Sequence, residues 1–264
     1  MKIGFIGLGN MAKAMIGGML QKHMVAAADI MGSAKNEKTA AAMKESYKIA
    51  TTTDNQEVAA FADVLILAVK PQFFPEVLPE IKDSIKKDAL IISIAAGKTI
   101  DYIEQALGSD IKLVRCMPNT PALVGEGCTG MCRNVNITDA QMQQCIELMQ
   151  SFGLASEVPE RLMDAVVGVS GSSPAYVFIF LEAMADAAVA AGMPRAQAYQ
   201  FAAQSVMGSA KLMLETGKHP GELKDMVCSP AGTTIAAVKV LEEKGLRSAV
   251  MSAMDACIEK SRSL

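Results

Sequence analysis

The chain has 264 residues, of which 51% are hydrophobic, and its formal net charge is -3. This length and composition suffice for one large domain or two modest ones with a substantial core, and two domains are expected. A slightly acidic chain without runs of like charge lacks the basic field that attracts nucleic acids, so we expect a small-molecule ligand and no nucleic-acid partner.

Targeting and cysteine patterns point to a cytoplasmic protein. The chain opens on an apolar run and a glycine turn, which differs from a secretory signal peptide. The apolar residues 175–181 are interrupted by Glu182 and Asp186 and are expected to be too short to cross a bilayer. The six cysteines form no Cys-x-x-Cys pair and there are only two histidines, which argues against structural zinc or a disulfide framework. We therefore expect no membrane partner and no metal.

The first predicted elements are a strand, a tight turn and a helix. Residues 3–6 are apolar, residues 7–12 are GLGNMA, and helix-favouring residues follow. Glycine at positions 7 and 9 lets the backbone turn sharply and approach a diphosphate, while the small Ala12 lets the helix pack close to the strand. The free N–H groups at the helix start favour an anion. This pattern favours a dinucleotide site, although a plain strand-to-helix turn needs the same glycines.

Strand-like and helix-like stretches alternate through the next part of the chain. The apolar runs rich in Ile, Val and Leu cover residues 2–7, 26–31, 63–69, 89–95 and 111–116. Such alternation predicts a mainly parallel sheet with helices on both faces. Residues 138–141 form a capping box, which predicts a helix to about Phe152 that Gly153 ends.

Beyond about residue 161 the strand signals disappear. The predicted helices, each ended by a glycine, cover residues 174–191, 194–215 and 230–244, and a last helix runs to the C-terminus. The first of them is apolar nearly all round and needs cover on more than one side, which a second subunit can give. The sequence therefore predicts an α/β dinucleotide-binding domain, residues 1–158, followed by an all-helical domain, residues 159–264.

Segments that follow the predicted strands are candidates for a ligand site, because open parallel sheets bind ligands at the carboxyl ends of their strands. The third, fourth and fifth strands are followed by AVKPQ (68–72), SIAAG (93–97) and CMPNTPALVGEG (116–127). Proline and glycine can simply end a strand. Three such segments on one edge favour a lined site.

Two segments of the helical half put serine before proline at a predicted helix start: SGSSPAY (170–176) and CSPAGTT (228–234). Serine is a good N-cap and proline is tolerated in the first turn, so both segments can be simple helix starts. In the second, the backbone N–H groups of Gly232, Thr233 and Thr234 are expected to face outward, where they would hold a substrate carboxylate without an arginine.

The second predicted strand bears on the choice of cofactor. Asp29 lies at the usual distance after the glycines for a ligand of the ribose 2′-OH, but near the strand's start. Ser33 and Lys35 lie at its end, and a hydroxyl with a cation suits a 2′-phosphate. We therefore expect a preference for NADPH, with NADH also used.

Six segments of the chain resemble the pyrroline-5-carboxylate reductase family, in order and over nearly the whole length. They are IGLGNMAKAM, AVKPQ, SIAAGKTI, MPNTPALVGEG, DAVVGVSGSSPAYVF and HPGELKDMVCSPAGTTIAAVKVLEEKGLRSAVMSA. The resemblance implies NAD(P)H-dependent reduction of the cyclic imine 1-pyrroline-5-carboxylate to L-proline, the last step of proline biosynthesis. It also implies a Rossmann domain, a helical dimerisation domain, and homodimers that assemble further, up to a decamer.

The resemblance also assigns site residues. Those carried over to the nucleotide are Ile6, Gly7, Leu8, Gly9, Asn10, Met11, Ser33, Asn55, Ala68, Val69, Lys70, Pro71, Ile94, Ala95 and Ala96. The substrate would meet Glu160, Thr233 and Thr234, with Thr234 nearest the imine nitrogen. Ser173 departs from the family motif SGSGPAY, which has glycine there, and a serine N-cap before Pro174 is still expected.

These residues agree with imine reduction. An imine carbon accepts hydride readily once its nitrogen is protonated, so the reaction needs positioning and one weak proton donor. The Thr234 hydroxyl fits that role, although a threonine in the first turn of a helix can also only satisfy local backbone. The two histidines lie outside these segments, His219 at an expected helix start or surface position, and the cysteines are expected to be small buried residues.

Two alternatives are a β-hydroxyacid dehydrogenase and a dinucleotide-binding regulator without turnover. The former also joins a Rossmann half to a helical half, but its family uses a lysine in the first helix of the second domain. Between Arg161 and Lys211 the only basic residue here is Arg195. The latter would have a damaged substrate loop, whereas SPAGTT is intact.

Overall fold

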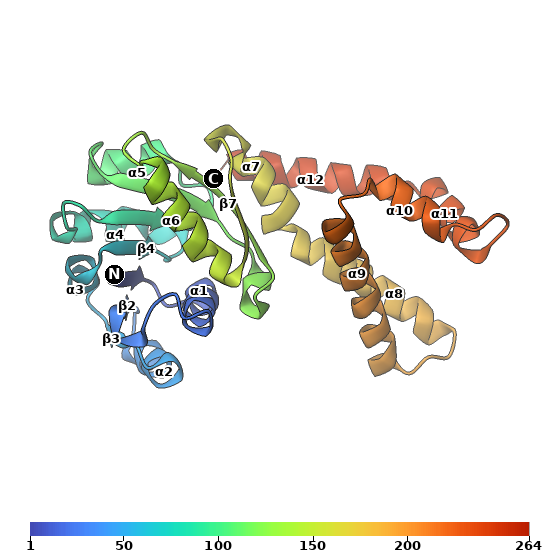
Figure 1. Cartoon of the computed structure of the whole chain (residues 1–264), viewed down its shortest axis with the longest axis horizontal. Coiled ribbons are helices and arrows are strands. Elements are labelled where there is room, and N and C mark those ends of the chain that lie inside the picture. Colours follow the sequence, from blue (N-terminus) through green and yellow to red (C-terminus); the bar gives the residue numbers. More distant parts are fainter. Residues whose placement is uncertain (264) are drawn as a thin grey trace. The chain divides into compact units, whose positions relative to one another are not determined.

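The computed structural model describes residues 1–263, which form two compact units (Figure 1). The first unit comprises Met1–Ser172 together with the C-terminal segment from Cys257, and the second comprises Ser173–Ala256. The chain therefore passes between the units twice, once after Ser172 and once before Cys257.

The first unit is built on one eight-stranded sheet with the order β3-β2-β1-β4-β5-β6-β7-β8. The strands are β1 Ile3–Ile6, β2 Ile30–Ser33, β3 Ala50–Thr52, β4 Val64–Leu67, β5 Leu90–Ser93, β6 Lys112–Met117, β7 Gly127–Arg133 and β8 Gly153–Glu157. All neighbouring pairs are parallel except β6 with β7. The predicted α/β fold with a mainly parallel sheet is thus confirmed, with one antiparallel pair.

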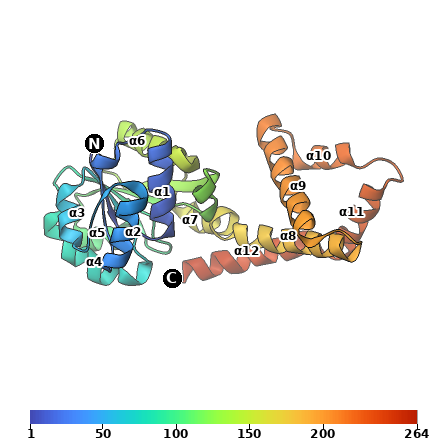
Figure 2. The same cartoon turned by 90° about the horizontal axis from the view of Figure 1, so that it is seen from below.

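Helices lie on both sides of this sheet (Figure 2). They are α1 Asn10–Gln21, α2 Glu37–Tyr47, α3 Asn55–Phe61, α4 Phe74–Ile81, α5 Ile100–Leu107 and α6 Asp139–Met149. Two apolar clusters fill the spaces between the layers: one contains side chains of α1, α2 and α6, and the other contains side chains of α3, α4 and α5. The buried run of β4, Val64–Leu67, contributes to both clusters, which is why such a strand is apolar throughout.

The sequence predicts most of these elements, but the second strand lies later in the chain than the predicted residues 26–31. Residues 27–29 form a short 3₁₀ helix and β2 begins at Ile30, so Asp29 lies before the strand and Ser33 ends it, as expected for these two side chains. The capping box is confirmed: the Thr138 hydroxyl accepts from the Gln141 N–H at 3.3 Å, and Gln141 Oε1 accepts from the Thr138 N–H at 3.0 Å. Gly153, with φ 146°, ends that segment.

The helical part of the chain follows the prediction in outline. Its helices are α7 Met163–Val166, α8 Ser173–Ala190, α9 Arg195–Thr216, α10 Pro220–Val227, α11 Thr233–Glu243 and α12 Leu246–Arg262. Helix α10 was not predicted. His219 is its N-cap, where Nδ1 accepts from the Gly221 N–H at 3.1 Å, so the expected helix-start role of this histidine is confirmed.

The two predicted serine-proline helix starts are wrong. Residues Val167–Gly171 form a π-helix that joins α7 to α8, and the Ser172 N–H donates to the Val167 carbonyl at 2.8 Å. The chain is therefore already helical when it reaches Ser173, and no serine caps α8 from outside. At the second segment, residues Ser229 to Ala231 form a turn in which Ala231 has φ 57°, and α11 begins only at Thr233 with Gly232 as its N-cap.

The continuous helix from Glu160 to Ala190 is 31 residues long and, by length and composition, apolar enough to cross a membrane. The expectation that this apolar stretch is too short was therefore wrong, because the helix continues on both sides of residues 175–181. Only 11% of its most apolar window is buried within the chain. A helix covered by a second subunit has the same composition.

The second unit has almost no core of its own. Its buried hydrophobic residues are Ala185 of α8 and Ala198 and Ala202 of α9, two helices that pack against each other. Large apolar side chains are exposed instead, among them Phe178 (63%) and Leu214 (80%). A hollow of about 530 Å³ between α11 and α12 is also lined mainly by apolar side chains. Exposed apolar surface on this scale marks an interaction face.

Burial also predicts how the thiols react. All six cysteines are free, and Cys116, Cys132 and Cys145 are buried. Burial raises the pKa of Cys132 and of Cys145 to about 12, and it also raises the pKa of Cys116 well above that of an ordinary thiol. Only the thiolate is alkylated, and at pH 8 a thiol with such a pKa is about 10⁻⁴ ionised. We expect these three cysteines to stay unlabelled by iodoacetamide in the native protein and to react in denaturant, as read by mass spectrometry. Rapid native labelling of Cys145 would contradict this.

Candidate functional site

The turn between β1 and α1 leaves an open anion-binding position. Gly7 has φ 98°, and a Cβ on it would lie 2.9 Å from the carbonyl of Ala68, so the turn can pass this close only as glycine. Gly9 is the N-cap of α1 without a side-chain hydrogen bond, and a Cβ there would meet nothing within 4 Å. The first intrahelical bond of α1 runs from the Lys13 N–H to the Gly9 carbonyl, so the earlier N–H groups have no partner in the helix, which fits the diphosphate of a dinucleotide.

Sheet register brings the other predicted nucleotide segments to this same edge. Ile6 is paired with both Ser33 and Leu67, and Leu67 is paired with Ser93. The Gly7 N–H donates to the Ser33 carbonyl at 3.0 Å, and the Ala68 N–H to the Ile6 carbonyl at 2.8 Å. Segments 6–11, 68–71 and 94–96 thus leave adjacent strands side by side.

The end of β2 contains a hydrogen-bonded chain of three side chains. Buried Ser33 donates its hydroxyl proton to Asn55 Oδ1 at 2.7 Å, and Asn55 Nδ2 donates to Glu80 Oε2 at 2.8 Å. Lys35 is exposed, and its Nζ lies 5.2 Å from the centroid of the Phe73 ring. Two side chains, Ser33 and Lys35, were predicted to bind a 2′-phosphate, and only Lys35 is exposed to solvent. Sequence reasoning did not find Glu80, which comes from a distant helix.

Glu160 is held by two donors. It begins the 3₁₀ helix Glu160–Leu162 just after β8, and its Oε1 accepts from Arg115 Nη1 at 2.9 Å and from the Ile100 N–H at 2.9 Å. The Arg115 side chain is 7% exposed and that of Glu160 is 35% exposed. Arg115 lies on β6 and Ile100 is the first residue of α5, so three elements meet at this carboxylate. Arg115 was not among the predicted site residues.

Asn119 joins two of the quoted segments. Its Nδ2 donates to the Ser170 carbonyl at 2.9 Å, and its Oδ1 accepts from the Cys128 N–H at 2.8 Å. This buried amide ties the loop after β6, the start of β7 and the π-helix together. The glycine- and proline-rich segment 116–127 is therefore a fixed structure and not a free loop.

The amino end of α11 differs from the prediction in one donor. The Gly232 N–H donates to the Ser229 carbonyl at 3.0 Å, so it closes the preceding turn and does not face outward. The first intrahelical bond runs from the Ala236 N–H to the Gly232 carbonyl at 3.4 Å. This leaves the N–H groups of Thr233, Thr234 and Ile235 without a partner in the helix. Among residues 1–263 the partly buried Thr234 makes no side-chain hydrogen bond.

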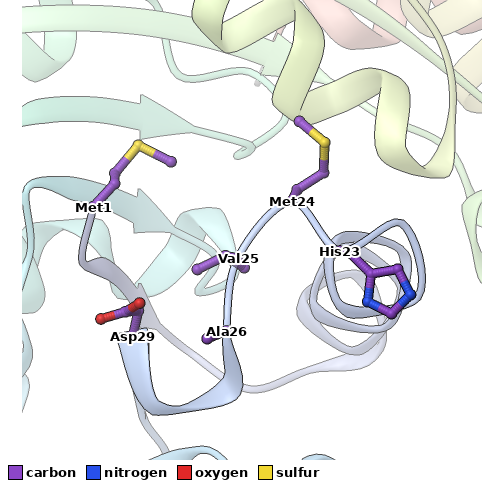
Figure 3. A pocket seen from close by; sticks show the side chains of 6 residues that line it. All are labelled: Met1, His23, Met24, Val25, Ala26 and Asp29. Atoms are coloured by element: carbon purple, nitrogen blue, oxygen red, sulfur yellow. The ribbon is translucent and has the colours of Figure 1, made fainter.

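A separate hollow of about 370 Å³ lies away from the strand-end edge (Figure 3). It is lined by Met1, His23, Met24, Val25, Ala26 and Asp29. His23 follows the C-terminal end of α1, a helix of 12 residues that spans about 18 Å from the glycine turn. This hollow is therefore not part of the candidate site. No group of three or more His, Cys, Asp or Glu side chains that could hold a metal occurs in the described residues.

Comparisons with known proteins agree with this geometry. Residues 160–264 match the family model for pyrroline-5-carboxylate reductase dimerisation, and residues 2–97 match that for NADP oxidoreductase, coenzyme F420-dependent. A pyrroline-5-carboxylate reductase of Escherichia coli is 54% identical over 263 residues, which cover 100% of this chain and 98% of that protein.

Two solved structures are similar over nearly the whole chain. That of a Coxiella burnetii pyrroline-5-carboxylate reductase has a TM-score of 0.92 at 36% identity and covers 99% of this chain and 97% of its own. That of the Plasmodium falciparum pyrroline carboxylate reductase, with NADP bound, has a TM-score of 0.90 at 32% identity with the same coverage of 99% and 97%. Sequence and structure agree over the full length, and the chain therefore belongs to the pyrroline-5-carboxylate reductase family of NAD(P)-dependent oxidoreductases.

Proposed function

We propose that the protein reduces 1-pyrroline-5-carboxylate to L-proline with NADPH, the last step of proline biosynthesis, in the cytoplasm. The observation that carries this proposal is the amino end of α11. There the N–H groups of Thr233 and Thr234 have no partner in the helix, and the Thr234 hydroxyl has no hydrogen-bond partner among residues 1–263. At this helix start the N–H groups can bind one carboxylate, and the hydroxyl can bind one ring nitrogen. The 54% identity to a reductase over the whole chain supports the same activity.

The nucleotide would lie along the edge formed by residues 6–11, 68–71 and 94–96, with Ser33, Lys35 and Asn55 around its ribose. The α1 N–H groups hold the diphosphate, and glycine at positions 7 and 9 keeps side chains out of its way. When bound, NADPH supplies the hydride that the imine carbon accepts. The chain itself contributes binding and orientation.

The substrate would be held by groups suited to its two charges. We infer that the N–H groups of Thr233 and Thr234 bind its carboxylate, while the Thr234 hydroxyl hydrogen-bonds the ring nitrogen. Gly232 supports this start as the N-cap, and a Cβ on it would lie 3.1 Å from the Ser229 carbonyl oxygen. The Glu160 carboxylate would face the positive charge of the protonated ring. No strong acid is required, because a protonated imine is already activated.

A direct assay tests this proposal. We expect NADPH absorbance to fall when 1-pyrroline-5-carboxylate is added and proline to appear in equal amount. Oxidation of a β-hydroxyacid with NADP⁺ in place of this reaction would identify the alternative dehydrogenase. Tight NADPH binding without turnover of either substrate would identify a regulator.

The family match makes this an oligomeric protein with a small-molecule substrate. We propose a homodimer through the helical unit, which assembles further up to a decamer and uses neither a membrane nor a nucleic acid. The apolar helix α8 supports this, because Glu182 and Asp186 interrupt it and Asp186 forms an ion pair with Arg195. Charges of this kind fit a protein interface better than lipid.

The cofactor preference predicts the effect of Lys35. Lys35→Ala is expected to lower the NADPH to NADH ratio of kcat/KM by about 10-fold, since it removes a charge-assisted bond to the 2′-phosphate. Ser33→Ala is expected to lower this ratio less than Lys35→Ala does, because the Ser33 hydroxyl already donates to Asn55. Lys38→Ala, another exposed lysine nearby on α2, is the matched control. An unchanged ratio in the Ser33→Ala, Lys35→Ala double variant would refute this assignment.

A further inference from the structure

We propose that Arg115 is a positioning residue that orients the Glu160 carboxylate toward the substrate ring. The inference rests on the proposed function, in which Glu160 contacts the substrate. It adds a residue that the sequence motifs do not contain, because Arg115 lies within β6, one position before the segment CMPNTPALVGEG.

Both donors to Glu160 use the same carboxylate oxygen. Arg115 Nη1 and the Ile100 N–H each lie 2.9 Å from Oε1. Among residues 1–263 no donor contacts Oε2. Two donors from two separate elements, β6 and α5, restrain Oε1 more than a single donor would. The second oxygen is therefore held in place and remains available to a ligand.

Burial shows that this pair is not an ordinary surface ion pair. The Arg115 side chain is 7% exposed, and Glu160 is its only ion-pair partner in the described chain. Removing a charge from water has a high free-energy cost, so an arginine is placed there only where its partner compensates it. Neighbouring Cys132 has a pKa raised to about 12, mainly by burial, so this thiol is neutral and does not compete for the guanidinium.

The two bonds to Glu160 also connect its carboxylate to the edge of the sheet where the nucleotide is proposed to bind, formed by residues 6–11, 68–71 and 94–96. Ile100 is the first residue of α5, directly after the loop that contains residues 94–96. Thr99 caps α5 by accepting from the Tyr102 N–H at 3.1 Å, and Glu160 satisfies the Ile100 N–H. A carboxylate bound to this helix start keeps a fixed distance from the loop that would hold the nicotinamide. The Glu160 carboxylate and the loop of residues 94–96 thereby belong to one part of the first unit.

The kinetic signature follows from the charge that Glu160 meets. The protonated ring is positive before hydride arrives, so a correctly oriented carboxylate stabilises the bound substrate at least as much as the transition state. Loss of that contact raises KM more than it lowers kcat. A purely structural loss of folded enzyme lowers kcat and leaves KM unchanged. The two parameters thus separate positioning from damage.

The test compares Glu160→Gln, Arg115→Met and the double variant, at saturating NADPH, with KM and kcat measured for 1-pyrroline-5-carboxylate. Each single variant is expected to raise KM by about 10- to 100-fold, the range of one charge-assisted hydrogen bond, with kcat within about threefold of wild type. The double variant is expected to be no worse than the worse single one, because Arg115 acts through Glu160. Arg115→Lys is expected to give an intermediate KM, and the NADPH Kd is expected to stay unchanged in all variants.

The possible failures are distinct. A wild-type KM in Glu160→Gln would overturn the Glu160 contact of the proposed function. A raised KM in Glu160→Gln with a wild-type KM in Arg115→Met would overturn only the positioning role. Additive losses in the double variant, or a lower kcat with unchanged KM in Arg115→Met, would also overturn it. If Arg115→Met unfolds, Arg115→Lys carries the test, and an unchanged KM in that variant would overturn the inference.

Discussion

Replacement of Thr234 by alanine is expected to lower kcat/KM for 1-pyrroline-5-carboxylate by about 10- to 10³-fold, which equals roughly 1.4–4 kcal/mol of transition-state stabilisation. The hydroxyl would orient the ring nitrogen and relay a proton from water, since a threonine hydroxyl is itself a poor acid. Fold and NADPH binding should survive, because the Thr234 side chain makes no hydrogen bond within the described chain and lies in the first turn of α11.

Thr234→Ser is the matched control for this prediction. Serine keeps the hydroxyl and the backbone N–H and loses only the methyl group, so most of the activity should remain. The measurements are kcat/KM for the imine and the NADPH Kd for both variants. Wild-type turnover in Thr234→Ala would remove Thr234 from the mechanism. A large loss of NADPH affinity would show instead that its role is structural.

The part of the fold that the sequence predicts well depends on local patterns. Apolar runs such as β4, and the glycine turn at Gly7 and Gly9, carry their signal within a few residues. Parallel register then brings the ends of β1, β2, β4 and β5 together, so the segments of the nucleotide edge follow from the strands alone. Short or polar strands such as β3, with the sequence ATT, have no comparable pattern and were not found.

The side-chain contacts of the site could not be predicted, because they join residues far apart in sequence. Arg115 and Glu160 are 45 positions apart, and Asn55 and Glu80 are 25 apart. No periodicity links such pairs, and only the packed sheet places them together. The segment SPAGTT was recognised, yet its helix start was placed three residues early, because the left-handed Ala231 leaves no trace in composition.

The helical second unit was predicted to need a second subunit to cover its apolar surface. The small number of its hydrophobic residues that are buried within the chain supports this prediction. Three buried alanines cannot supply the apolar burial that an independent domain of this size needs. Small residues at the contact of α8 and α9 let the two helices approach closely but leave the large side chains outside. The dimerisation family assigned to residues 160–264 gives those side chains a place to be buried.

A charge on the exposed face of α8 is therefore expected to prevent assembly and, with it, activity. Phe178 is 63% and Phe180 is 43% exposed in the single chain. In an interface, Phe178→Glu or Phe180→Glu would bury an unpaired carboxylate, which costs several kcal/mol. We expect monomers by light scattering, reduced helical circular dichroism because the second unit lacks its own core, and a loss of activity of about 100-fold or more.

The matched control for this prediction is Val135→Glu, because Val135 is 97% exposed and lies in the first unit, before α6. That variant adds the same charge at an exposed apolar position outside the helical unit, so assembly and activity should match those of the wild type. Light scattering and NADPH oxidation are measured on the same samples at the same protein concentration. A fully active monomer of Phe178→Glu would refute both the interface and the dependence of the active site on it, whereas inactive dimers would locate the damage within the subunit.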